Sequence, residues 1–266
     1  MRLSVGQTYL KGSFSKYQSQ LDFLELTADP QRLPSLAKLK EVRAKASEDF
    51  VFSVALTEHA LIPGEQAAQR LAYGLKVAKT LRARWLVLRT ASNFRPSPQN
   101  EKQLAAWVES LKSEAFALAW EPHGLWEPRQ AARVAENLGL QLVQDAVNFE
   151  AGGITYLRLA GLGATRRMGE SLLEKIAVRA VTATELYLAL AVPGAVSIRR
   201  QLQELFEYDG EDDELDDELA ALDADHDAED VEDDVEDDDD AEDDDDDADL
   251  EDDDDADQET EPESRG

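Results

Sequence analysis

Eight short apolar runs recur along residues 1–206, and longer amphipathic stretches separate most of them. The runs are rich in Val, Leu and aromatic residues. Most of them lack the polar alternation of a sheet with one face in solvent, so we expect parallel strands covered on both faces. The predicted strands are residues 2–6, 22–26, 50–56, 85–89, 116–121, 140–145, 154–160 and 185–192.

The stretches between the runs have helical periodicity, and their ends carry helix signals. Pro34 suits the first turn of the first helix, Ser97 suits an N-cap followed by Pro98 at N1, and Gly139 suits a helix end. After the sixth strand we expect only a loop, at residues 146–153. The predicted helices cover residues 35–46, 64–81, 97–113, 127–140, 171–181 and 194–205.

Alternation of strands and helices at this spacing predicts parallel βαβ units. Eight strands favour a compact TIM-like (β/α)8 barrel, with thin helical cover after the first and sixth strands. The alternative is an open doubly wound sheet. The segment after the first strand, GQTYLKGS at 6–13, is not the glycine-rich GxGxxG fingerprint of the nucleotide-binding form of that fold.

Charge divides the chain into two parts. Residues 207–266 hold 38 of the 58 acidic residues and one of the 27 basic residues, which leaves 20 acidic and 26 basic residues in 1–206. The net charges are therefore −37 and +6. A segment so acidic and so poor in apolar residues cannot offset its ordering entropy, so we predict a barrel domain at 1–206 and a disordered tail at 207–266.

The composition also bears on partners and location. The chain has no cysteine, which excludes disulfides and thiol chemistry. No segment resembles a signal peptide or reaches the apolar length of a membrane span, so a soluble, cytoplasmic protein without membrane contact is expected. The tail would compete with phosphate for the basic residues of the barrel, so direct nucleic-acid binding by the full chain is not expected. Three roles stay open for the tail: it could recruit a basic protein partner, mimic nucleic acid and screen the basic barrel, or confer solubility.

One run in the tail has metal-like spacing. Asp223, Asp225 and Asp227 follow the EF-hand pattern, but Ala228 stands at the glycine position and Asp234 at the final glutamate. We interpret this run as low-complexity sequence.

Polar residues at or near strand ends form the candidate site. The carboxyl ends of parallel barrel strands meet at one mouth, where barrel enzymes place their chemistry. The candidates for a catalytic role are Glu25, Glu121, Asp145 and Arg158, and the candidates for substrate binding are Arg89, His59, His123 and Tyr156.

Each of these residues also has a structural interpretation. Glu25 suits a buried ion pair with Arg158, since either charge alone would be costly to bury. Asp145 precedes a loop, where aspartate commonly serves as a turn residue. His59 and His123 lack a metal-binding spacing such as HExxH. Structural pairing and a ligand-binding mouth both remain open.

Four segments together resemble a known family. They are FLEL at 23–26, RLPS at 32–35, WEPHGLW at 120–126 and YLRLAG at 156–161. In order and spacing they are similar to motifs of the domain of unknown function 72, or YecE-like, family. The resemblance covers most of residues 1–206 and implies a TIM barrel. The activity of that family is not established, so the resemblance implies a fold and not a reaction.

The chain departs from the family pattern where that pattern has hydrogen-bond donors. After the third strand, where the family has a lysine, this chain has Ala55 and Leu56. RTAS at 89–92 replaces the family's Gln-Leu-Pro-Pro segment. LALAVPG at 188–194 lacks the asparagines that the family has near the end of its eighth strand. His123 replaces an arginine and Ala160 a histidine.

These losses favour a non-catalytic or activity-altered barrel that binds a ligand or partner. The alternative is a metal-assisted hydrolase or lyase that acts on a phosphate- or sugar-containing substrate, with a divalent ion at the acids of the mouth.

Overall fold

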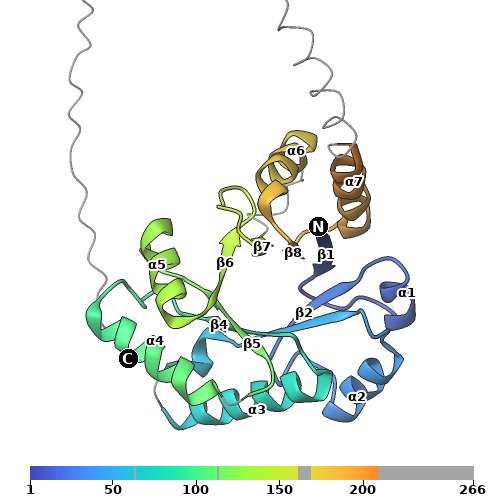
Figure 1. Ribbon diagram of the computed structural model, residues 1–266. Coiled ribbons are helices and arrows are strands. Elements are labelled where there is room, and N and C mark those ends of the chain that lie inside the picture. Colours follow the sequence, from blue (N-terminus) through green and yellow to red (C-terminus); the bar gives the residue numbers. More distant parts are fainter. Residues whose placement is uncertain (63, 113, 161–168, 209–266) are drawn as a thin grey trace, which may run out of the picture. The chain divides into compact units, whose positions relative to one another are not determined.

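The computed structural model describes residues 1–62, 64–112, 114–160 and 169–208. Eight parallel strands close into a barrel in chain order, which confirms the predicted (β/α)8 fold (Figure 1). Each strand lies within two residues of its predicted bounds. Residues 209–266 of the predicted acidic tail, including the EF-hand-like run, lie outside the described residues. The strands are β1 Arg2–Gln7, β2 Phe23–Thr27, β3 Val51–Ala55, β4 Trp85–Arg89, β5 Ala117–Glu121, β6 Gln141–Asp145, β7 Ile154–Leu159 and β8 Glu185–Leu190.

Helices lie around the strands in Figure 1. They are α1 Phe14–Gln18, α2 Leu36–Lys45, α3 Glu65–Leu81, α4 Pro98–Leu111, α5 Pro128–Leu138, α6 Glu170–Arg179 and α7 Ala195–Tyr208, with short 3-10 helices η1 Glu58–Ala60 and η2 Ala180–Thr182. The helical cover is thin where it was expected to be. α1 has only five residues, and no helix separates β6 from β7. Within the described ranges, no helix combines the length and hydropathy needed to cross a membrane.

The predicted helix ends are confirmed with one exception. Ser97 caps α4 by accepting a hydrogen bond from the Asn100 amide at 3.2 Å, and Gly139 ends α5 with φ of 66°. Pro34 does not lie in the first turn of α2. Ser35 is the N-cap, because its hydroxyl accepts from the Lys38 amide, so Pro34 precedes the helix.

The barrel interior is filled by side chains that point inward from alternate positions of the strands. Four aromatic rings form its centre, with Tyr156 centred 5.9 Å from Phe23, 6.0 Å from Trp85 and 6.0 Å from Tyr187. Gly6 faces β2 where a Cβ atom would lie 1.7 Å from the Phe23 carbonyl oxygen, so only glycine permits this approach of the two strands. The interior is therefore a packed core and not a pore.

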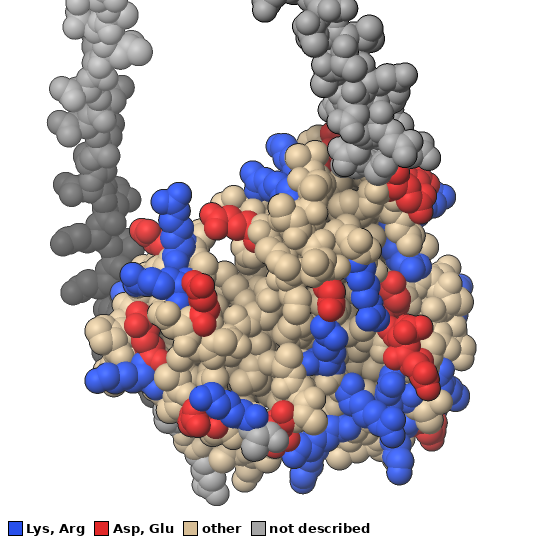
Figure 2. All heavy atoms as spheres, in the orientation of Figure 1, with Lys and Arg blue, Asp and Glu red and all other residues tan. Residues whose placement is uncertain are grey.

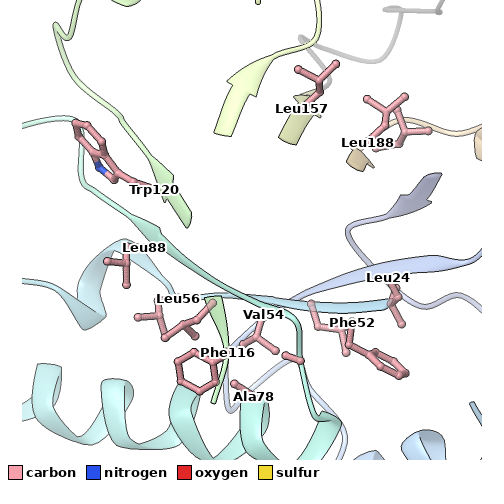
Figure 3. Packing of buried hydrophobic residues seen from close by; sticks show 14 of the residues in the cluster. Leu24, Phe52, Val54, Leu56, Ala78, Leu88, Phe116, Trp120, Leu157 and Leu188 are labelled. Carbon is pink, nitrogen blue, oxygen red and sulfur yellow. The ribbon is translucent and has the colours of Figure 1, made fainter. Parts of the chain in front are cut away.

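A second apolar layer joins the strands to the helices. Val54 and Leu56, in and just after β3, lie close to Ala78 of α3 in Figure 3, and all three are fully buried. Leu157 and Leu188 extend the same layer around β7 and β8. Both faces of the sheet are therefore covered, and the few buried polar side chains inside the barrel, among them Glu25 and Ser53, stand out against this apolar packing.

Candidate functional site

A buried ion pair lies above the aromatic centre, toward the carboxyl ends of the strands. Arg158 Nη2 lies 2.6 Å from Glu25 Oε1 and 2.7 Å from Oε2, and Glu25 is completely buried. The Tyr156 hydroxyl donates to Glu25 Oε2 at 2.6 Å. Because this uses its only proton, the Ser53 hydroxyl, 2.9 Å away, is left to donate to the Tyr156 oxygen. The pairing of Glu25 with Arg158 is the structural interpretation drawn from the sequence.

Glu121, at the end of β5, joins this pair to the surface of the mouth. Its Oε1 lies 3.0 Å from Arg158 Nε, outside the angular range of a hydrogen bond, and 3.2 Å from His123 Nε2. Its Oε2 accepts from Arg89 Nε at 2.8 Å. The side chains of Arg158 and Glu121 are 10% and 11% exposed, against 20% for Arg89 and 42% for His123. A continuous chain of charges, Glu25–Arg158–Glu121–Arg89, therefore leads from the core toward solvent.

This arrangement sets the protonation of the cluster. Burial alone would raise the pKa of Glu121, but the hydrogen bond with His123 and the charges of Arg158 and Arg89 lower it to about 2. Burial and the adjacent Glu25 carboxylate raise the pKa of Tyr156 well above its ordinary value. Burial opposes the charge of Arg158, yet the two carboxylates raise the pKa of that residue. At neutral pH the phenol is neutral, and Glu121 and Arg158 are charged.

The turn after β5 holds Glu121 and His123 against the loop after β4. Gly124 has φ of 102°, and a Cβ atom there would lie 2.9 Å from the Ser92 carbonyl oxygen and 3.0 Å from that of Phe94. Trp126 Nε1 donates to the Phe94 carbonyl at 2.6 Å. These contacts explain the glycine and the second tryptophan of WEPHGLW, because they fasten one mouth loop to the next.

Thr90 connects the same two loops from inside. Its Oγ1 accepts from the backbone amide of His123 at 3.2 Å and from Trp120 Nε1 at 3.3 Å. Thr90 is completely buried. The backbone that carries His123 is therefore positioned by a side chain of the neighbouring strand end.

Two residues predicted for the mouth lie apart from the cluster. The exposed Asp145 accepts a hydrogen bond from the Val147 amide at 2.8 Å and forms no ion pair with Arg158, although the two are register partners. It serves as the turn residue of its loop, as its structural interpretation predicts, and it does not join the mouth cluster. His59 is exposed in η1 and has no bond to Glu25, Glu121 or Arg158.

Sequence reasoning missed Ser53 and Thr90. Ser53 had a usable signal, since in VFSVA it alternates with Val51 and Ala55, as Glu25 does with Phe23. Its position therefore predicts an inward side chain at the level of Glu25, with which it is in register. Thr90 had no such signal, because its role depends on the path of the β5 turn.

The cluster does not suit a divalent metal ion. Among the residues that the structure describes, no group of three or more His, Asp or Glu side chains converges as a metal site would require. The two acids at the mouth contact arginines, and the third acid, Asp145, faces its own loop.

Comparison with known proteins supports the fold. No family model matches the sequence, and no curated protein matches it. Solved structures do. A DUF72 family protein from Enterococcus faecalis has 13% identity and a TM-score of 0.60 over 77% of this chain and 98% of its own. A DUF72 family protein from Thermotoga maritima has 14% identity and a TM-score of 0.53 over 79% and 100%.

A further solved structure matches the barrel at a lower score. A D-tagatose 3-epimerase-like protein has 13% identity and a TM-score of 0.50, over 79% of this chain and 99% of its own. The chain is a TIM-type (β/α)8 barrel. More particularly, it has the fold of the DUF72 proteins, which is the fold that the resemblance in its sequence implies.

Proposed function

We propose that the protein binds a small polar ligand at the carboxyl-end mouth of its barrel and does not convert it. The observation that carries this proposal is that both mouth carboxylates are engaged by arginine. Arg158 contacts Glu25 and Glu121, and Arg89 holds the outer oxygen of Glu121.

An engaged carboxylate is a poor catalytic group. A general base is most effective when its pKa lies near the operating pH, whereas the pKa of Glu121 is lowered to about 2. Glu25 is farther from solvent and accepts from Tyr156. A metal-assisted hydrolase or lyase is supported less well, because its ligands would first have to leave their arginines.

The groups left available at the mouth favour a ligand with hydrogen-bond acceptors. Arg89 uses its Nε on Glu121, and its two terminal nitrogens make no hydrogen bond with any described residue. His123 is the most exposed member of the cluster and contacts the other carboxylate oxygen of Glu121. A planar guanidinium recognises oxygen pairs well, so the ligand we propose is a phosphate- or sugar-containing molecule.

A calorimetric screen of sugars, sugar phosphates and inorganic phosphate tests this proposal. We expect at least one compound to bind with 1:1 stoichiometry to the wild type and about tenfold or more weaker to Arg89→Gln, because a charge-assisted contact is lost. Arg95→Gln is the matched control. Arg95 lies exposed in the loop that follows β4, its side chain makes no hydrogen bond within the described ranges, and its replacement should leave affinity unchanged.

Two results would contradict the proposal. In the first, the ligand binds equally well to the wild type and to Arg89→Gln. In the second, NMR shows that a bound compound is turned over and that Glu121→Gln abolishes the turnover.

We also propose that the acidic segment 207–266 recruits a basic protein partner. Its net charge of −37 supports this, because so many carboxylates create a strong negative electrostatic potential at any surface that they contact. The Debye length of about 8 Å in physiological salt screens this potential at longer distances. Binding of polylysine to the full chain should weaken steeply as salt rises and should be lost when the segment is removed. Equal binding to the shortened chain would refute this proposal.

A further inference from the structure

A groove of about 640 Å³ lies outside the barrel, next to the carboxyl ends of β1 and β2. Thr27 ends β2 and Thr8 follows β1, and α1, α2 and the loops that precede them supply most of the walls. None of Glu25, Arg89, Glu121, His123 and Arg158 lines it, so it is separate from the mouth cluster. Its volume falls within the range of sites for small organic ligands.

The groove exists because α1 is too short to cover its strands. In a (β/α)8 barrel each helix normally buries the outward face of the sheet. The five residues of α1 bury only Phe14 and Tyr17. The floor that remains is apolar and formed by Phe14, Leu26, Leu39 and Val42, with the partly buried Leu10 and Leu33 beside it.

The rim of the groove is basic. Arg32, Lys38 and Lys45 line it together with a single acid, Glu41. Glu41 is held by Lys38 at 2.8 Å, while Lys45 forms no ion pair with any described residue. In Figure 2, Lys and Arg side chains gather over α2, which carries Lys38, Lys40, Arg43 and Lys45. An apolar floor under a cationic rim matches a molecule with an apolar body and an anionic end.

We propose that this groove binds an amphipathic carboxylate of low molecular weight. Its alkyl or aryl body lies on Phe14, Leu39 and Leu33. Its carboxylate lies at the rim, beside Lys45. This site is independent of the ligand proposed for the barrel mouth.

Titration of the full chain with straight-chain carboxylates of increasing length tests the proposal. Calorimetry is carried out below the micelle concentrations, with the alcohol of equal length as the uncharged probe. We expect 1:1 binding that tightens with each added methylene, up to the length of the groove, and no binding of acetate. The alcohol should bind about two- to fivefold more weakly, since an exposed charge contact contributes little.

Two pairs of variants place the ligand. Lys45→Met keeps the apolar stem, so it should remove the advantage of the carboxylate over the alcohol, whereas Lys102→Met on the exposed face of α4 should not. Leu33→Gln should weaken both probes about tenfold by making the floor polar. Leu125→Gln is its control, because Leu125 is 71% exposed and lies outside the groove.

The proposal is overturned if no carboxylate binds, or if binding is non-stoichiometric. It is also overturned if Lys45→Met and Leu33→Gln bind the carboxylate as the wild type does. Because the probes lack the sugar and phosphate groups used for the mouth, and Arg89→Gln should not affect them, failure here leaves the mouth proposal intact.

Discussion

Glu25 and Arg158 contribute to stability mainly through each other. Removing one partner of a buried pair leaves an uncompensated charge, which typically costs about 3–5 kcal/mol. We therefore expect Glu25→Gln to lower the free energy of unfolding by about this amount, measured by urea denaturation. Glu41→Gln is the control, because Glu41 forms an exposed pair with Lys38, and its loss should change stability by less than about 1 kcal/mol. Similar losses in both variants would show that the buried pair has no special weight.

Glu121 should make stability depend on pH in the acid range. Its folded pKa is lowered from 4.5 to about 2, so its contribution is present above pH 4.5 and is lost as the pH falls toward 2. Relative to Glu121→Gln, the wild type should be about 3 kcal/mol more stable at pH 7.

By pH 3 this advantage should shrink by more than half. Urea denaturation of both proteins from pH 7 to pH 3 measures the difference, and the many other carboxylates cancel between them. A difference independent of pH would mean that Glu121 is not held ionised by its basic neighbours.

At the scale of elements, the turn after β5 fixes the geometry of the mouth. Gly124 combines a positive φ with carbonyl oxygens that would lie within 3.0 Å of a Cβ atom. We expect Gly124→Ala to destabilise the protein by about 1–3 kcal/mol in urea denaturation. Gly139→Ala, at φ of 66° but with nothing within 4 Å, should cost less, about 1 kcal/mol. The order of these two losses, if reversed, would show that loop packing at Gly124 is unimportant.

The elements could be predicted because local signals agree with the fold. The segment WLVLR, apolar up to Arg89, matches β4 residue for residue, and Ser97 and Gly139 mark the start of α4 and the end of α5 as expected. The prediction that Pro34 lies in the first turn of α2 was wrong, because a proline just before a helix and a proline in its first turn give the same sequence signal. The Ser35 hydroxyl fixes the start of α2, because it accepts a hydrogen bond from the Lys38 amide.

The site was only partly predictable. Glu25 and Arg158 could be paired from the cost of burying either alone. Asp145 ends its strand just as Glu121 does, so the two look alike in sequence. They differ in the turns that they begin. Asp145 begins a tight turn in which Asn148 pairs back to it, whereas Glu121 begins a turn fastened to the β4 loop by Trp126.

For the whole molecule, the barrel should fold independently of the acidic segment. The residues beyond Tyr208 are rich in acid and poor in apolar groups, so they have little surface to bury against a core. We expect a chain ending at Tyr208, where α7 ends, to melt within about 2 °C of the full chain in scanning calorimetry. A large drop in melting temperature or a loss of cooperativity would show that the segment is part of the fold.

The proposed function depends above all on the arginine contacts of both mouth carboxylates, Glu25 and Glu121. While these contacts persist, neither carboxylate can act as a general base or a metal ligand. A calorimetric titration with Mn²⁺ and Zn²⁺ tests this most directly, on the chain ending at Tyr208 so that the acidic segment adds no weak sites. We expect the same titration for the wild type and Glu121→Gln, without a stoichiometric site. A 1:1 site that Glu121→Gln removes would contradict this, because Glu121 would then have exchanged its arginines for a metal ion, and the metal-assisted hydrolase or lyase would become the leading function.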